Sequence, residues 1–284
     1  MYNRYAVIVP LVALVWGGSF IAVKVAVGGL SPILLALLRF ALASPAMLGI
    51  ALLKRKSLVI HVKDVPAVVL LALTGVTLLY VFQFTGIKYT TATSAALLIN
   101  TNVLFIAILS AILLKEVLSR KKIFGVICGF LGAALIVTNG SLLVTRSFGG
   151  DMLIILSALC WAVYSVAGKK VMERYDPITI NTHVFFLGTL LLVPFAFRDM
   201  AGATVSGEAW AIIVYLALAC SVFGYVVWYD ALARMDATKV AIFLNLIPLF
   251  AILIAHVVLH ERITTVTVIG AALILYAIYL TEKG

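Results

Sequence analysis

The sequence predicts an all-α integral membrane protein with ten transmembrane helices arranged as two inverted five-helix repeats. Three observations carry this prediction: an apolar composition, a series of apolar runs about 20 residues long, and an internal repeat at one fixed offset. Of the 284 residues, 64% are hydrophobic and 11% are charged, and the mean hydropathy is +1.21. A soluble domain is about 45–50% apolar and about 25% charged. This composition excludes a soluble enzyme, a nucleic-acid binder and a disordered chain.

The apolar runs have the length that crosses a hydrocarbon core of about 30 Å as an α-helix. Because every backbone polar group in lipid must be bonded internally, runs of this length favour helices over barrel strands. Breaks at Ser31-Pro32 and Asp176-Pro177 separate runs that would otherwise merge. We therefore expect ten spans, at residues 6–27, 32–53, 65–86, 91–114, 123–139, 150–168, 177–197, 209–232, 238–259 and 263–281.

The basic residues predict the orientation of these spans. With ten spans both termini lie on one side, and fifteen of the 21 Lys and Arg residues are expected on that side. Five are expected on the other side, and Arg39 falls inside the second span. Since Lys and Arg gather in cytoplasmic loops, we expect a multi-pass protein of the cytoplasmic (inner) membrane with both termini in the cytoplasm. The net charge of +10 then reflects topology and does not indicate a nucleic-acid partner.

The two halves of the chain repeat each other at an offset of 145 residues, with about 27 identities in 139 ungapped pairs. Shared composition alone would give about a dozen. Each half holds five spans, an odd number, so the second half must enter the membrane from the opposite face. We expect two inverted repeats, residues 1–145 and 146–284, an architecture typical of secondary transporters with a midplane substrate site. The rare residue types that recur include Trp16/Trp161, Pro32/Pro177, Tyr80/Tyr225, Asn100/Asn245 and Glu116/Glu261.

Polar and aromatic residues at midspan are the candidates for substrate binding. Amides are costly in lipid, so they should face other helices or water. The alternative for each residue is an interhelical hydrogen bond that only packs the bundle. Aromatic rings with neutral amides suit an uncharged or zwitterionic, partly apolar solute. The predicted set is Trp16, Ser19, Tyr80, Gln83, Asn100, Asn102, Trp161, Tyr164, Tyr225, Trp228 and Asn245.

Four further residues are candidates for gating or coupling. Pro248 removes a backbone donor from the ninth span and could hinge that helix or fix a kink. Asp230 and His183 are protonatable, although an Asp230–Arg234 pair and a packing role for His183 are the alternatives. Arg39 lies about two turns into the second span, counted at 3.6 residues per turn.

No cofactor or metal is expected. Cys128, Cys160 and Cys220 lie in separate spans and make no metal-binding spacing. The sequence also shows no nucleophile–base set or paired carboxylates, so we do not expect an enzyme.

Several segments resemble the EamA family of the drug/metabolite transporter superfamily. They are Leu14–Phe20 (LVWGGSF), Leu38-Arg39-Phe40, and the closing segment of each half, from Ala92 through Asn100 to Glu116 and from Asp236 through Pro248 to Glu261. A helix carrying Gly125 or Gly270 follows each closing segment, and the proline of the family pattern is replaced by Val103 in the first half. The resemblance covers both repeats. It implies a ten-helix carrier that exports small metabolites such as amino acids, with a cavity formed mainly by helices 1, 3, 4, 6, 8 and 9.

We therefore expect a secondary exporter of amino-acid-like, zwitterionic or partly apolar metabolites that works by alternating access between the repeats. Its expected partners are a small-molecule substrate and the lipid bilayer, with the chain as a monomer or weak homodimer. The alternatives are a channel-like facilitator, an exchanger of phosphorylated or drug-like solutes, and, more remotely, a membrane enzyme or sensor. A phosphate exchanger would need converging cations, whereas Arg39, Lys24 and Lys169 fall in different helices near different faces.

Overall fold

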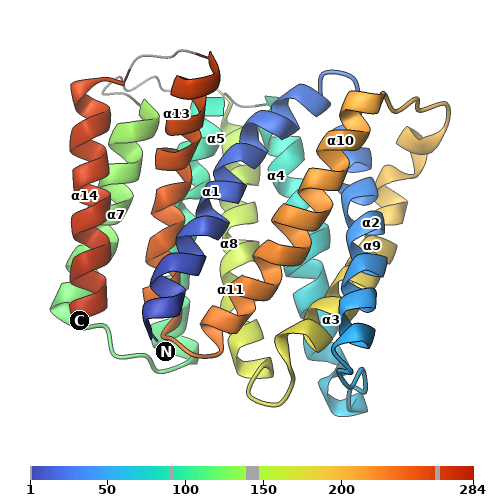
Figure 1. Cartoon of the computed structure of the whole chain (residues 1–284), viewed down its shortest axis with the longest axis horizontal. Helices are drawn as coiled ribbons and strands as arrows, with labels where there is room; N and C mark the ends of the chain where they lie inside the picture. Colours follow the sequence, from blue (N-terminus) through green and yellow to red (C-terminus); the bar gives the residue numbers. More distant parts are fainter. Residues whose placement is uncertain (1, 90–91, 139–146, 260–262) are drawn as a thin grey trace.

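A computed structural model of the chain describes residues 2–89, 92–138, 147–259 and 263–284, and every regular element within those ranges is a helix (Figure 1). Nine helical stretches among the described residues are long and apolar enough to cross a membrane, and Leu97–Leu113 is a shorter apolar helix. Together they match the ten predicted spans in order. The all-helical membrane fold is therefore confirmed.

Six spans are single continuous helices. Pro32 and Pro177 start two of them, as expected for proline in the first helical turn, where its missing N–H needs no partner. These six are α1 (Tyr2–Ala26), α2 (Pro32–Leu53), α7 (Arg120–Thr138), α8 (Phe148–Val171), α9 (Pro177–Met200) and α14 (Thr265–Lys283).

The other four spans are interrupted. The third is built from η1 (Val62–Asp64), α3 (Val65–Ala72), the π-helical η2 (Leu73–Thr77) and α4 (Leu78–Tyr89). The fourth contains α5 (Ala92–Ile99) and α6 (Thr101–Leu113). The eighth contains α10 (Gly207–Tyr215), the π-helical η3 (Leu216–Phe223) and α11 (Gly224–Leu232). The ninth contains α12 (Ala237–Ala241), the 3₁₀ segment η4 (Ile242–Asn245) and α13 (Leu246–Leu259).

These interruptions recur at the repeat offset. Residues 73–77 of η2 correspond to 218–222, which lie within η3. The fourth span breaks at Asn100, and η4 ends at the equivalent Asn245. The backbone irregularities therefore lie at equivalent positions in both halves. Single-turn π segments are frequent at functional sites, so these positions are candidates for the site.

Four pairs of equivalent residues touch each other. When two copies of a unit are related by a two-fold rotation, only residues beside the rotation axis can contact their own counterparts. The contacts therefore place a pseudo-two-fold axis between the first three spans of each half. The rings of Trp16 and Trp161 are 5.3 Å apart, the rings of Phe40 and Phe185 are 5.2 Å apart, and the hydroxyl pairs Ser44/Thr189 and Tyr80/Tyr225 are 3.1 and 3.2 Å apart.

The last helices of the two repeats, α7 and α14, pack side by side at one edge of the molecule (Figure 1). Glycines permit this close approach. A side chain at Gly125 would meet the carbonyl of Ala277, and one at Gly270 would meet the carbonyl of Gly132. Small residues serve this purpose at helix contacts in membranes, and the two contacts are again equivalent by the 145-residue offset.

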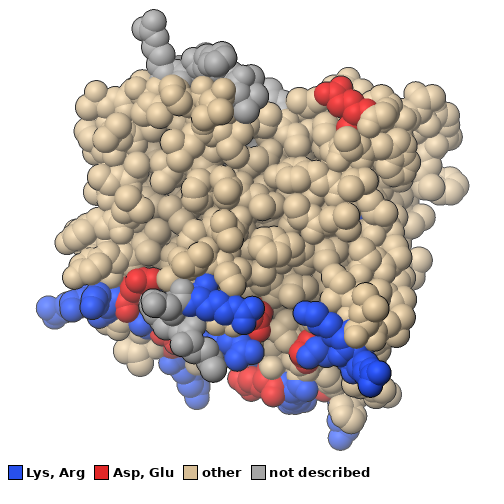
Figure 2. All heavy atoms as spheres, viewed as in Figure 1, with Lys and Arg blue, Asp and Glu red and all other residues tan. Residues whose placement is uncertain are grey.

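Basic side chains are gathered on one face of the molecule. Both termini lie on that face in Figure 1, and Figure 2 shows the Lys and Arg side chains concentrated there. We call it the terminus face. The loops and helix ends on it carry the predicted basic clusters, which include Lys54–Lys56, Arg120–Lys122, Lys169 and Lys170.

Candidate functional site

A cavity of about 550 Å³ lies between the two repeats. Its walls come from spans 1, 3, 4, 6, 8 and 9, with one residue, Arg39, from span 2. About half of the lining is aliphatic, including Leu79, Ile99, Leu244 and Ile247. This volume falls within the range of small-molecule sites.

An aromatic cluster forms one side of the cavity. Trp161 lies at its centre, with its ring centroid 5.3 Å from that of Trp16 and 5.4 Å from that of Tyr225. Both contacts are edge-to-face, the arrangement that ring quadrupoles favour. The indole N–H of Trp16 donates to the carbonyl of Cys220 at 2.9 Å, which fixes that ring against the η3 segment.

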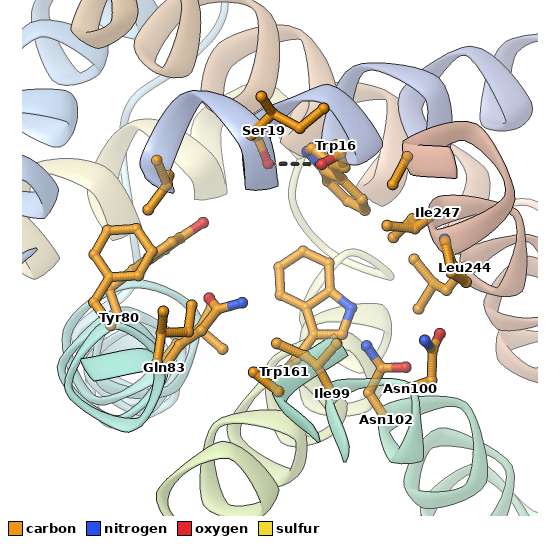
Figure 3. A pocket seen from close by; sticks show the side chains of 18 of the residues that line it. Trp16, Ser19, Tyr80, Gln83, Ile99, Asn100, Asn102, Trp161, Leu244 and Ile247 are labelled. Carbon is orange, nitrogen blue, oxygen red and sulfur yellow. Dashed lines mark hydrogen bonds between the residues drawn. The ribbon is translucent and has the colours of Figure 1, made fainter. Parts of the chain in front are cut away.

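Eight of the eleven predicted substrate-binding residues line the cavity. Figure 3 shows Trp161 between Gln83 on one side and Asn100 and Asn102 on the other, with Trp16 and Ser19 across the space. The hydroxyl of Ser19 donates to the Trp16 carbonyl at 2.7 Å. The eight are Trp16, Ser19, Tyr80, Gln83, Asn100, Asn102, Trp161 and Tyr225.

The structure places the other three, Tyr164, Trp228 and Asn245, in packed positions outside the lining. Tyr164 donates from its hydroxyl to Asn181 Oδ1 at 2.7 Å, and Trp228 donates from its indole nitrogen to Ser165 Oγ at 3.0 Å. Asn245 is fully buried and lies against Gly129 of α7. All three carry polar groups at the expected depth but turn them toward neighbouring helices.

Of the four candidates for gating or coupling, two line the cavity and two lie outside it. Pro248 and Arg39 line the cavity. His183 bonds through Nδ1 to the carbonyl of Thr179 in its own helix at 2.9 Å. Asp230 lies at the terminus face, where it accepts from the Tyr5 hydroxyl at 2.6 Å and from Arg234 Nε at 3.2 Å.

The cavity leads toward the face opposite the termini. In α1 the lining residues lie in the half of the helix nearest that face, in span 3 they lie along α4, the part of the span nearest that face, and in α8 the lining residue Trp161 lies at mid-helix. A second cavity of about 430 Å³ shares Val23, Val27, Phe84 and Ile87 with it and is lined by the α1–α2 loop at that face.

Packed tyrosines close the cavity toward the terminus face. Tyr164 and Tyr229 stack with ring centroids 4.6 Å apart, and both are buried. The Tyr225 hydroxyl donates to the carbonyl of Gly75 at 2.8 Å, and the Tyr229 hydroxyl donates to that of Tyr164 at 3.0 Å. These bonds join spans 3, 6 and 8 on the side of the cavity nearer the terminus face.

An ion-pair cluster joins the repeats at the terminus face itself. The carboxylate of Glu116 accepts from the backbone N–H of Ala237 at 2.6 Å and of Thr238 at 3.3 Å, and it lies 3.4 Å from Lys169 Nζ. We call these four residues the terminus latch. Sequence reasoning missed this role, although the recurrence of Glu116 at Glu261 and of Lys169 at Lys24 was a signal for it; Glu261 and the side chain of Lys24 lie outside the described residues.

A second ion pair lies beside the terminus latch. Lys122 Nζ donates to Asp236 Oδ2 at 2.8 Å. Burial raises the pKa of Asp236, but the hydrogen bond to Lys122 and the charges of Lys122, Lys169 and Lys239 together outweigh it, so this pKa lies below its usual value. Asp236 is therefore ionised at neutral pH and strengthens the closure of this face.

Over the described ranges, no group of three or more His, Cys, Asp or Glu side chains is arranged to hold a metal ion. The cavity instead offers rings, amides, aliphatic surface and one guanidinium. This arrangement is suited to binding a small amphipathic solute.

Comparison with known proteins agrees with this fold. The profile of the EamA-like transporter family matches twice, at residues 4–138 and 148–282. An uncharacterized transporter of Archaeoglobus fulgidus is 40% identical, over 99% of this chain and 98% of that protein. A probable amino-acid metabolite efflux pump of Salmonella typhimurium is 28% identical, over 96% and 93% of the two chains. A crystal structure covering 98% of this chain and 96% of its own superposes with a TM-score of 0.85 at 20% identity, which shows the shared fold.

Proposed function

The chain belongs to the EamA-like transporter family, and from this premise we propose that it exports amino-acid-like solutes by alternating access between its two repeats. Family membership makes it a multi-pass membrane transporter of small metabolites. The solute class, the direction of transport and the mechanism are the proposal.

The observation that carries the proposal is a cavity between the repeats that adjoins a second cavity toward one face and is covered by packed side chains toward the other. The closure combines the packed tyrosines with the terminus latch, so it lies entirely on one side of the cavity. A carrier needs such one-sided access, and inverted repeats supply the opposite state by exchanging the roles of the two halves.

The orientation follows from charge. Since Lys and Arg gather in cytoplasmic loops, we place the terminus face in the cytoplasm of a cell bounded by this inner membrane. The cavity then faces outward, the state that releases an exported solute.

The lining supports a zwitterionic or partly apolar solute. Indole and phenol rings with aliphatic side chains accept an apolar group, and Gln83, Asn100 and Asn102 offer neutral amides. The similarity to a probable amino-acid metabolite efflux pump supports the same class.

Solute exchange in proteoliposomes tests the proposal. Vesicles loaded with unlabelled L-phenylalanine should take up labelled L-phenylalanine faster than empty vesicles, with saturation. A channel predicts equal rates in loaded and empty vesicles, and an enzyme or sensor predicts no flux. If no proteinogenic amino acid moved, the proposed solute class would be wrong.

Trp16→Ala provides the matching variant. It removes the ring that packs on Trp161 in the cavity, and it should lower exchange at least tenfold while the protein still elutes as a folded monodisperse species. Trp210→Ala is its control because Trp210 is 46% exposed near the start of α10. Equal losses from both variants would remove the cavity from the transport pathway.

A further inference from the structure

Among the residues that the structure describes, Arg39 is a buried cation without an acidic partner. Its side chain lines the cavity while the residue is only 4% exposed, and among the described residues no carboxylate lies within 4.0 Å of it. A charge removed from water is strongly destabilising unless it is paired. In membrane proteins such charges face water-filled cavities and mark solute pathways.

The surroundings hold the guanidinium in one orientation. Nε donates to Ser221 Oγ at 2.7 Å, and the guanidinium carbon lies 4.7 Å from the centroid of the Tyr80 ring and 5.1 Å from that of Phe40. The ring faces offset part of the cost of burial through cation–π attraction. Because the bond to Ser221 uses Nε, the terminal nitrogens keep the planar fork that matches a carboxylate.

Two other polar atoms of the lining are buried and have no partner among the described residues. Asn102 Oδ1 and Trp161 Nε1 make no hydrogen bond within the described part of the chain, and each residue is 7% exposed. One is an acceptor and the other a donor, and both residues line the cavity. Buried polar groups are normally paired, so a solute that reaches them should bring a donor for the amide and an acceptor for the indole.

Arg39 and Asn102 have no polar counterpart in the second repeat. At the 145-residue offset, Arg39 corresponds to Val184 and Asn102 corresponds to Ile247, which is an apolar residue of the same cavity. The residues that recur in both repeats, such as Trp16 and Trp161, lie beside the pseudo-two-fold axis. Arg39 and Asn102 are present in the first repeat alone. A solute held by them therefore has one defined orientation.

We propose that Arg39 binds the carboxylate of the transported solute and that Asn102 accepts from its ammonium group, so that the cavity selects amino acids with an apolar side chain. The aliphatic lining around Leu244 and Ile247 receives that side chain, and Trp161 donates to a solute oxygen. This inference rests on the proposed function and adds the groups that determine its specificity.

Calorimetric titration of the purified full chain in nanodiscs tests the assignment with three probes: L-phenylalanine, L-phenylalaninamide, which lacks the carboxylate, and 3-phenylpropanoate, which lacks the ammonium. Wild type should bind the amide about 10- to 100-fold more weakly than phenylalanine, the range expected for one lost charge-assisted contact. This comparison needs no variant.

Variants separate the two contacts. Arg39→Gln should bind phenylalanine and its amide within about threefold of each other, and Arg39→Lys should retain part of the preference. Asn102→Leu should weaken phenylalanine but not 3-phenylpropanoate. Arg198→Gln is the matched control because it removes the same charge from an exposed position near the end of α9.

The outcomes are distinguishable. Equal binding of all three probes to wild type, or an acid-over-amide preference that survives in Arg39→Gln, would overturn the role of Arg39 and leave the proposed function standing. No binding of any probe to wild type would contradict the proposed solute class, and the inference with it.

Discussion

Two equivalent tyrosines on the pseudo-two-fold axis have different roles. The Tyr80 and Tyr225 hydroxyls are 3.2 Å apart, and the Tyr225 hydroxyl donates its proton to the Gly75 carbonyl. Tyr225 can then only accept from Tyr80, because a hydroxyl has one proton. The local symmetry is therefore broken by the direction of two hydrogen bonds.

This direction predicts unequal effects of removing each hydroxyl. Tyr225→Phe leaves the Gly75 carbonyl and the Tyr80 hydroxyl without their partner, and should lower the free energy of unfolding by about 1–2 kcal/mol. Tyr80→Phe keeps the bond to Gly75 and should cost less than about 1 kcal/mol. Thermal unfolding of both variants in the same detergent measures the order, and a larger loss in Tyr80→Phe would contradict the assigned direction.

The sequence was sufficient to predict how deep in the membrane each site residue lies, but not whether its side chain faces the cavity or a neighbouring helix. Trp16, Tyr80 and Asn100 stood out because costly residue types recur at the repeat offset. Trp228 and Asn245 satisfy the same criterion of depth, yet they face neighbouring helices. Trp228 follows the π-helical η3, and Asn245 is the last residue of the 3₁₀ segment η4. Segments that depart from the α-helical period change the direction of nearby side chains, which the periodicity of the sequence does not predict.

At the scale of elements, the contact between the π-helical η2 and span 6 depends on a glycine. Gly75 lies within it, directly against the Tyr164 ring, where a Cβ atom would overlap the ring carbons. The ring stacks on Tyr229 and both side chains are fully buried, so the ring has little room to move aside. Gly75 thus allows span 3 to pack closely against span 6 on the side of the cavity nearer the terminus face.

Gly75→Ala should therefore lower thermal stability, by about 1–3 kcal/mol as expected for overpacking a buried contact. Gly49→Ala is the matched control, since Gly49 lies inside α2 with no atom within 4 Å of an added Cβ. There alanine should be neutral or stabilising, because it is the better helix former. Equal melting temperatures for the two variants would show that the π segment tolerates a side chain.

The terminus latch predicts a local change in protection. Glu116→Gln removes the charge that pairs with Lys169 and weakens the bonds to the backbone N–H groups of Ala237 and Thr238. Hydrogen exchange of those two amides should accelerate about tenfold, which corresponds to about 1.4 kcal/mol.

Lys56→Gln is the control for the latch. It breaks an ion pair with Asp176 on the same face, where both side chains are about one-third exposed, and exposed pairs contribute little. Exchange at Ala237 and Thr238 should be unchanged in this variant. Unaltered exchange in Glu116→Gln would mean that the latch does not hold the start of α12.

At the scale of the whole molecule, the ten spans and their repeat could be predicted, whereas the conformation could not. Apolar length and the offset of 145 determine which segments cross the membrane and how the halves correspond. The same helices serve both states of a carrier, so nothing in the apolar pattern distinguishes them. The closed face became evident only from contacts between distant residues, such as Glu116 with Ala237.

Sided modification of one cavity residue tests the central claim, that this cavity is the solute site and is reached from one face at a time. Ser19→Cys would be placed in a chain whose Cys128, Cys160 and Cys220 are replaced by alanine, in membrane vesicles of either orientation. We predict that an impermeant maleimide modifies it from the face opposite the termini, and that L-phenylalanine slows the reaction. Modification only from the terminus face, or a rate that the solute leaves unchanged, would contradict the account.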